Sequence, residues 1–257
     1  MPKFAANLTT MFTETSFLDR FAAAREHGFT AVEFQFPYAF PAADVRERLD
    51  ANGLELVLHN LPAGDWNAGE RGIACDPARI AEFRDSVGLA LEYALALGAP
   101  QLHCLAGKLP PGVEPELAHD TFVANLRHAA AELGRHGLRL LIEPINTYDI
   151  PGYFLSGSKQ AAGIIKECCA SNLFLQYDIY HMQRMEGELA GTLRSLLPLV
   201  KHIQVADNPG RHEPGTGEIN YPFLFALLDQ LGYEGWVGCE YTPATTTAAG
   251  LGWLRAT

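Results

Sequence analysis

Short apolar runs alternate along this chain with longer stretches in which apolar residues recur every three or four positions. The short runs have the length and composition of strands, and the longer stretches have the spacing of helices. Eight strands are predicted, at residues 4–8, 31–36, 54–61, 101–106, 139–145, 173–179, 202–206 and 236–241. Seven helices are predicted between them, at residues 17–27, 43–52, 78–97, 119–136, 158–170, 188–197 and 222–231, and part of an eighth follows the last strand.

The predicted strands are apolar almost throughout, which is typical of parallel sheets covered by helices. Eight βα repeats favour a closed (β/α)8 TIM barrel over an open sheet. No GxGxxG follows the first strand, so a dinucleotide-binding fold is disfavoured. The chain has the usual length of one such barrel and nothing in it resembles a linker, so residues 1–257 are predicted to form a single domain. Several helices end at glycines that would take left-handed conformations, namely Gly28, Gly53, Gly98, Gly137 and Gly232.

Composition narrows the class of partner. The net charge of -11 and a pI near 5.2 argue against nucleic acid, because phosphate binding needs a basic stripe that the sequence lacks. The first residues do not resemble a signal peptide, and no apolar run approaches membrane-spanning length. The five cysteines follow no disulfide pattern. We therefore expect a cytoplasmic protein with reduced thiols, no membrane partner and a small-molecule ligand.

Four consecutive predicted strands each end on a polar residue that can bind a metal: Glu143, Asp178, Gln204 and Glu240. The C-terminal ends of barrel strands meet at one mouth, so these side chains are expected to converge there. A buried carboxylate must be compensated by a cation or by hydrogen bonds. Three carboxylates and one amide suit a hard cation such as Mg²⁺ or Mn²⁺ better than Zn²⁺. The sequence therefore predicts one divalent-metal site on this rim.

Longer stretches of the sequence resemble the hydroxypyruvate isomerase family, within the xylose isomerase-like barrel superfamily. The resemblance runs from FAANLTTMF to TTTAAGLGWL and is carried by LHNLPAGDWNAGERGIAC, LIEPIN, QYDIYHMQRMEGEL, HIQVADNPGRHEPGTGEINY and GWVGCEY. It implies interconversion of hydroxypyruvate and tartronate semialdehyde, with Glu143 and Glu240 as proton acceptor and donor. It also implies a divalent metal at the four strand ends, where relatives commonly carry His at the position of Gln204.

The implied reaction moves a carbonyl group between adjacent carbons through a cis-enediolate. A metal that contacts both substrate oxygens would stabilise the negative charge, and two glutamates would handle the carbon-bound protons. Which glutamate removes the proton stays open at this point.

The implied substrate carries a carboxylate, so cations are expected near the mouth. Lys108, after the fourth strand, and Arg211, after the seventh, are the leading candidates, and Arg71 in the long loop after the third strand is another. His181 and His59 are the histidines most expected to face the substrate. The glycine-rich loop that carries Arg71 has the length of a lid.

Other activities remain open on the same scaffold. A 2-oxo-tetronate isomerase or a ketose 3-epimerase would use the same barrel and glutamate pair. A metal-dependent endonuclease would need several zinc-binding histidines and a basic DNA face, neither of which the sequence offers. A sugar-binding barrel without activity would have no need for two metal-bound glutamates. A homo-oligomer is compatible with the sequence, which does not specify the number of subunits.

Overall fold

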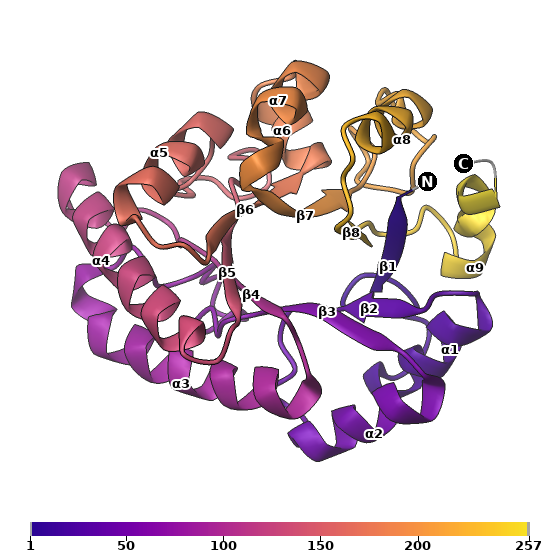
Figure 1. Ribbon diagram of the computed structural model, residues 1–257, viewed down its shortest axis with the longest axis horizontal. Helices are drawn as coiled ribbons and strands as arrows, with labels where there is room; N and C mark the ends of the chain where they lie inside the picture. The colour runs from indigo at the N-terminus through magenta and orange to yellow at the C-terminus, as the bar shows by residue number, and fades with distance from the viewer. Residues whose placement is uncertain (1, 256–257) are drawn as a thin grey trace.

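The computed structural model describes residues 2–255, so residues 1, 256 and 257 of the predicted domain lie outside the described chain. Eight parallel strands close into a barrel in sequence order, and helices surround it (Figure 1). The strands are β1 (Lys3–Asn7), β2 (Ala31–Glu33), β3 (Glu55–Asn60), β4 (Gln101–Cys104), β5 (Arg139–Ile142), β6 (Leu173–Asp178), β7 (Val200–Val205) and β8 (Trp236–Cys239). The predicted (β/α)8 barrel is confirmed, with each strand inside or overlapping its predicted run.

Each helix predicted between two strands is present. The helices are α1 (Arg20–Glu26), α2 (Ala42–Asn52), α3 (Ile80–Leu97), α4 (Pro115–Gly134), α5 (Ser158–Cys168), α6 (Ile179–Met185), α7 (Leu189–Leu196), α8 (Tyr221–Gln230) and α9 (Thr247–Gly250). Short 3-10 turns accompany them at η1 (Phe17–Asp19), η2 (Pro77–Arg79), η3 (Leu197–Leu199) and η4 (Leu251–Arg255). The glycines predicted to end helices have φ values of 90° at Gly28, 58° at Gly53, 74° at Gly98, 72° at Gly137 and 70° at Gly232.

One helix, α6, is absent from the sequence-based prediction. It begins directly after β6, because the side chain of Asp178 accepts hydrogen bonds from the backbone N–H groups of Tyr180 (2.7 Å) and His181 (3.4 Å). The predicted strand continued to Ile179, which instead is the first residue of the helix. Asp178 therefore ends a strand and caps a helix, and this geometry turns His181 back toward the barrel mouth.

The barrel interior changes from apolar to polar along its axis. Alternate residues of a strand face the same side, so Ala5 and Leu141 lie below Asn7 and Glu143 on the inner face. Gly238 leaves room for a buried carboxylate in the polar layer, since a Cβ atom there would lie 2.2 Å from Glu33 Oε2. An apolar floor therefore supports a polar layer at the C-terminal end of the barrel.

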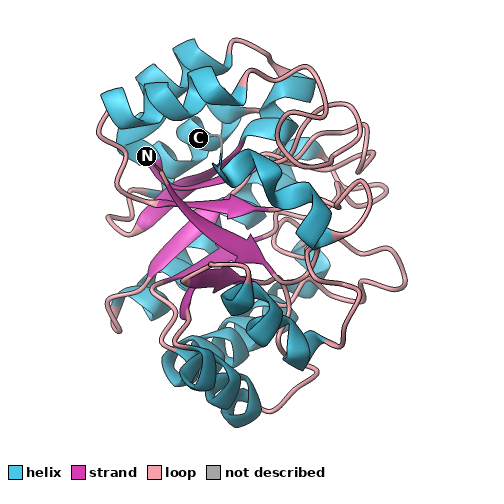
Figure 2. Ribbon diagram, turned by 90° about the vertical axis from the view of Figure 1, so that its right-hand side faces the viewer, coloured by secondary structure: helices cyan, strands magenta, loops and turns pink. Residues whose placement is uncertain are grey.

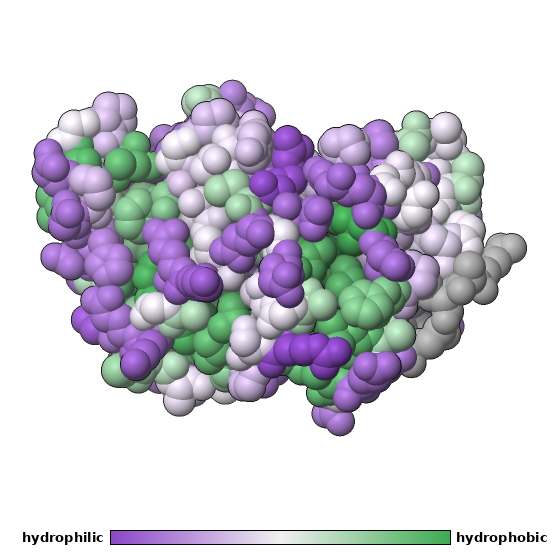
Figure 3. All heavy atoms as spheres, turned by 90° about the horizontal axis from the view of Figure 1, so that it is seen from above, coloured by the Kyte–Doolittle hydropathy of each residue, from purple (hydrophilic) through white to green (hydrophobic). Residues whose placement is uncertain are grey.

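The long loops gather at the end of the barrel to which the strand arrows point (Figure 2). On the face seen from the side of α5 to α8, hydrophilic side chains are spread over the surface and hydrophobic ones form smaller patches between them (Figure 3). No helix among residues 2–255 combines the length and apolar character that crossing a membrane requires. The loops at the C-terminal end of the barrel are the expected location of the site, because binding residues of such barrels lie on these loops.

Candidate active site

A cavity of about 250 Å³ opens at the C-terminal end of the barrel. Its lining includes Glu143, Gln204 and Glu240 from three of the four predicted strand ends, together with His181 and Arg211. The cavity therefore has the size for a small metabolite.

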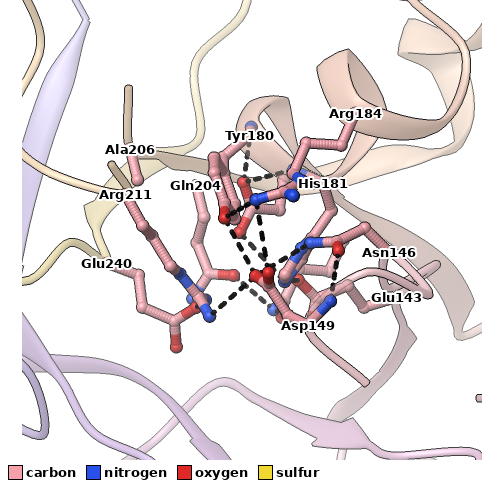
Figure 4. Close-up of polar contacts among 12 residues, drawn as sticks. Glu143, Asn146, Asp149, Tyr180, His181, Arg184, Gln204, Ala206, Arg211 and Glu240 are labelled. Carbon is pink, nitrogen blue, oxygen red and sulfur yellow. Dashed lines mark hydrogen bonds and ion pairs between the residues drawn. The ribbon is translucent and has the colours of Figure 1, made fainter. Parts of the chain in front are cut away.

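Three carboxylates and one imidazole converge beside this cavity, and Figure 4 labels Glu143, His181 and Glu240 among them. Glu143, Asp178, His181 and Glu240 each offer one ligand atom, and these atoms all lie within 4.8 Å of one another. The parallel register places Asp178 beside Gln204, and Gln204 beside Gly238, two residues before Glu240. The predicted convergence of strand-end carboxylates is thus present in the structure.

The cluster has too few hydrogen-bond donors for its negative charge. Glu143 Oε1 and Asp178 Oδ2 are buried and have no hydrogen-bond partner among the described residues. Burial, followed by the charges of Glu240 and Asp178, raises the pKa of Glu143 well above its usual range. Burial raises the pKa of Asp178 to about 7, although the nearby Arg211 opposes this rise. A divalent cation would offset both the repulsion and the loss of hydration, so the donor set fits a metal that prefers oxygen ligands.

The His181 ring lies near the same carboxylates without a hydrogen bond to them. Its Nε2 lies 3.6 Å from Asp178 Oδ2 and 3.9 Å from Glu143 Oε1. Asn146 Nδ2 donates to its Nδ1 at 2.7 Å, which in a neutral ring places the proton on Nε2. Burial, and then the charges of Arg211 and Arg184, lowers the pKa of His181 well below its usual value. A neutral ring that carries its proton on Nε2 suits a substrate oxygen better than a metal, in line with its predicted substrate-binding role.

Gln204, predicted to be the fourth metal ligand, lies in a network of hydrogen bonds. Its Oε1 accepts a hydrogen bond from Gln176 Nε2 at 2.7 Å, and its Nε2 donates to Glu33 Oε1 at 2.7 Å. Both ends of the amide are therefore occupied by protein partners. Gln204 lines the cavity, but the structure shows it as a link between other side chains, and its role as a ligand stays a prediction.

This network joins the two predicted proton carriers. Gln176 Nε2 also donates to Glu143 Oε2 at 3.0 Å. At the other end, Asn7 Nδ2 donates to Glu33 Oε1 at 2.9 Å and to Glu240 Oε1 at 3.2 Å. The continuous path runs through Glu143, Gln176, Gln204, Glu33, Asn7 and Glu240. Three neutral amides and the Glu33 carboxyl group thus fix the orientation of both glutamates from below.

Several of these buried residues were missed at the sequence level. A sequence pattern does mark three of them, because Asn7, Glu33 and Asn60 are the last residues of β1, β2 and β3. The four predicted ligands lie at or near the ends of the later strands in the same way. His103 also lines the cavity, and its Nε2 lies 3.5 Å from Glu143 Oε2. A polar residue at the end of an apolar strand therefore indicates the site at the first three strands as well.

Arg211 lies in the mouth, as predicted, and contacts Glu240. Its Nη2 donates to Glu240 Oε2 at 2.8 Å, and its guanidinium lies 5.2 Å from the centre of the Tyr180 ring. The Asp207 carboxylate shapes the loop that carries Arg211 by accepting hydrogen bonds from the backbone N–H groups of residues 208, 215, 217 and 219. Arg211 therefore supports the ionised form of Glu240, although burial raises the pKa of that carboxyl.

The other predicted substrate contacts differ in position. Lys108 is exposed and does not line the cavity, and its Nζ donates to Gly69 O at 3.0 Å. His59 is fully buried and also lies outside the lining, with its Nδ1 3.2 Å from Asn60 O. Arg71 does line the cavity. The structure therefore brings Arg211, His181 and Arg71 together at the cavity and leaves Lys108 and His59 outside it.

His59 provides a test of buried electrostatics. Burial lowers its pKa from 6.5 to about 4, so below pH 6.5 the unfolded chain binds a proton that the folded chain does not. The free energy of unfolding should therefore fall by about 3 kcal/mol through this residue as the pH drops from 6.5 to 4. We expect His59→Gln to show a shallower fall in the free energy of urea unfolding across this range.

The same replacement at exposed His136 is the control, because that ring is hydrated in both states. Equal slopes for the wild type and His59→Gln would contradict the assigned effect of burial.

A parallel barrel with a small cavity and a buried carboxylate cluster at its C-terminal mouth defines a class of enzymes for small, polar substrates. Comparison with known proteins agrees. Residues 21–257 match the model of the family described as xylose isomerase-like TIM barrel. The chain therefore belongs to the xylose isomerase-like TIM barrel family.

Similar proteins cover almost the whole chain. Hydroxypyruvate isomerase of Escherichia coli (strain K12) is 54% identical, over 99% of this chain and 98% of that protein. The 2-oxo-tetronate isomerase of Cupriavidus necator (strain ATCC 17699 / DSM 428 / KCTC 22496 / NCIMB 10442 / H16 / Stanier 337) is 51% identical, over 99% and 98%. A crystal structure named AP endonuclease, family 2 from Brucella melitensis superposes with a TM-score of 0.97 at 46% identity, covering 100% of this chain and 99% of that one.

Proposed function

We propose that this protein is an isomerase that interconverts hydroxypyruvate and tartronate semialdehyde. The observation that carries the proposal is a pair of buried glutamates, Glu143 and Glu240, at the mouth of a barrel that is 54% identical to a hydroxypyruvate isomerase. Movement of a carbonyl group between adjacent carbons requires one carbon-bound proton to leave and another to arrive. Two carboxyl groups beside one small cavity can carry these two protons.

In the forward direction, a carboxylate removes a proton from C3 of hydroxypyruvate and leaves a cis-enediolate across C2 and C3. The second glutamate then gives a proton to C2, and the hydroxyl proton on the C3 oxygen passes to the oxygen on C2, so that C2 carries a hydroxyl group and C3 becomes the aldehyde. We assign proton removal to Glu240, which Arg211, Asn7 and Gln35 hold as a carboxylate through three donated hydrogen bonds, at 2.8, 3.2 and 3.0 Å respectively.

 The Glu143 carboxyl accepts one such hydrogen bond, from Gln176, and is therefore less firmly held as a carboxylate than Glu240, so we assign the return of the proton to Glu143.

The other residues of the site hold the substrate oxygens. His181 carries a proton on Nε2 and is buried next to the carboxylate cluster, so it can donate a hydrogen bond to the oxygen on C2 or C3. Below the site, the network of Gln176, Gln204, Glu33 and Asn7 keeps both glutamates aligned.

A divalent cation, Mg²⁺ or Mn²⁺, belongs to the same proposal. Glu143, Asp178 and Glu240 would hold it, with Gln204 as the predicted fourth ligand, and the unpartnered oxygens of the cluster support this assignment. When bound, the cation supplies Lewis-acid stabilisation of the negative charge on the enediolate. Its identity is proposed from the preference of such cations for oxygen ligands.

A second candidate is isomerisation of a 2-oxo-tetronate, because a 2-oxo-tetronate isomerase is 51% identical over nearly the same length. The endonuclease name of the Brucella melitensis structure fits this chain less well. The net charge of -11 opposes DNA binding, and among residues 2–255 the grouped ligands include a single histidine. The proposed partner is therefore a small acid, and assembly into a homo-oligomer stays a prediction.

Purified protein incubated with hydroxypyruvate, 2-oxo-tetronate or a neutral ketohexose tests the choice of substrate. We expect kcat/KM for hydroxypyruvate to exceed that for the four-carbon acid by about 10-fold, because one additional carbon in the substrate changes the fit to the cavity by only a small amount. The ketohexose should react least. A higher kcat/KM for 2-oxo-tetronate would favour the second candidate. Turnover of neither acid would overturn the proposed function.

A further inference from the structure

Three cations near the mouth differ in whether a carboxylate already neutralises them. Arg211 pairs with Glu240 at 2.8 Å and lies 4.0 Å from Asp149 (Figure 4). Lys108 donates to a backbone carbonyl outside the cavity. Arg71 lines the cavity, and no carboxylate among residues 2–255 forms an ion pair with it. A cation that faces a cavity without an acidic partner is suited to receive an anionic ligand.

The guanidinium of Arg71 is held in place by its own loop. Its Nη1 donates to Trp66 O at 3.0 Å and to Glu70 O at 2.6 Å, and its Cζ lies 3.9 Å from the centre of the Trp66 ring. The two hydrogens of Nη1 are thereby used. The Nε and Nη2 hydrogens form no hydrogen bond within the described chain, and this edge of a guanidinium binds carboxylates in a bidentate manner.

The loop itself is fixed against the neighbouring loop. Gly72 N donates to Ala63 O at 2.9 Å, and Cys75 N donates to Ala106 O at 2.9 Å. A Cβ atom at Gly72, which has a φ of 112°, would lie 2.5 Å from Leu105 O, so the two loops meet without room for a side chain. Arg71 is therefore positioned before any ligand binds, which lowers the entropy cost of using it.

We propose that Arg71 binds the carboxylate of the substrate and determines the preference of the site for sugar acids over neutral sugars. The assignment rests on the proposed function in that the substrate is a small 2-oxo acid. A carboxylate bound at Arg71 would be anchored apart from Arg211, whose charge supports Glu240. A neutral sugar would cover the free edge of the Arg71 guanidinium without giving it an acceptor, which is a strong basis for rejection.

Kinetics and binding of Arg71→Gln test the proposal. We expect KM for hydroxypyruvate to rise about 100-fold with a much smaller change in kcat, because charge-assisted hydrogen bonds to the carboxylate are lost. Arg71→Lys should give an intermediate KM, since it keeps the charge and loses the fork. D-glycerate, which cannot isomerise, serves as the probe in calorimetry, and its affinity should fall by a similar factor in Arg71→Gln.

Lys108→Gln is the matched control, because it removes a cation from the same rim outside the cavity. It should leave KM and the affinity for glycerate within about twofold of the wild type, as expected for a surface substitution. Unchanged glycerate affinity in Arg71→Gln, or a loss confined to kcat, would overturn the role of Arg71. If the wild type binds glycerate through Arg71 but isomerises neither acid, the proposed function fails while the carboxylate assignment stands.

Discussion

Glu143→Gln should lose isomerase activity with little loss of stability. We expect kcat for hydroxypyruvate to fall about 10³-fold or more, because the amide cannot carry the proton that the carboxyl group returns to carbon. The free energy of unfolding should stay the same or increase in metal-free protein, since the replacement removes a buried group that repels Glu240 and Asp178. Steady-state kinetics and urea unfolding of the same preparation measure the two effects.

Glu218→Gln is the matched control for this loss. Glu218 is exposed and accepts hydrogen bonds from Gln183 and Asn208 outside the cavity. Its replacement should leave kcat near the wild-type value. Retention of full turnover by Glu143→Gln would remove the main support for acid–base catalysis and would favour a barrel that binds sugars without converting them.

Removal of the divalent cation should have the second largest effect. We expect a chelator to reduce kcat/KM about 10²-fold or more, because the negative charge of the enediolate would then lie among uncompensated carboxylates. Mg²⁺ or Mn²⁺ should restore activity. A cation that binds only the folded protein adds about 2.7 kcal/mol to the free energy of unfolding when its concentration is 100 times its Kd. The Tm of metal-free protein should therefore rise when the cation is added.

Asp178→Asn separates this binding from general effects of salt. Asp178 Oδ2 is one of the unpartnered oxygens, whereas its Oδ1 caps α6 and an asparagine can maintain that cap. The rise in Tm should therefore shrink in the variant while the fold is kept. Full activity and an unchanged Tm in the presence of chelator would show that Arg211 and the amide network compensate the site without a metal.

The fold could be predicted from the sequence because the barrel strands are apolar runs and several helices end at glycine. The helix α6 could not, because the apolar residues after Asp178 continue the pattern of the strand. Its start depends on the side chain of Asp178, which accepts hydrogen bonds from the next turn instead of pointing only at the site. A local hydrogen bond therefore overrides the hydrophobic pattern at this boundary.

Residues at the ends of the later strands were also predictable, because a carboxylate that follows an apolar run is conspicuous. Their partners were less so. The side-chain amide of Gln204 forms hydrogen bonds with Gln176 and Glu33. These pairings depend on the register between neighbouring strands of the barrel, which no local sequence pattern reveals. The ranking of Lys108 above Arg71 failed to anticipate the cavity lining for a similar reason, since the two loops meet at Gly72 and no local pattern reveals this contact.

Isomerisation in deuterated water tests most directly whether two glutamates remove and return the carbon-bound protons on either side of an enediolate. Because one glutamate removes the proton from C3 and the other returns a proton from solvent, NMR should show tartronate semialdehyde with deuterium at C2. Glu143→Gln should form this labelled product far more slowly. Absence of product, or product in which the hydrogen from C3 has moved to C2 without deuterium, would contradict the account.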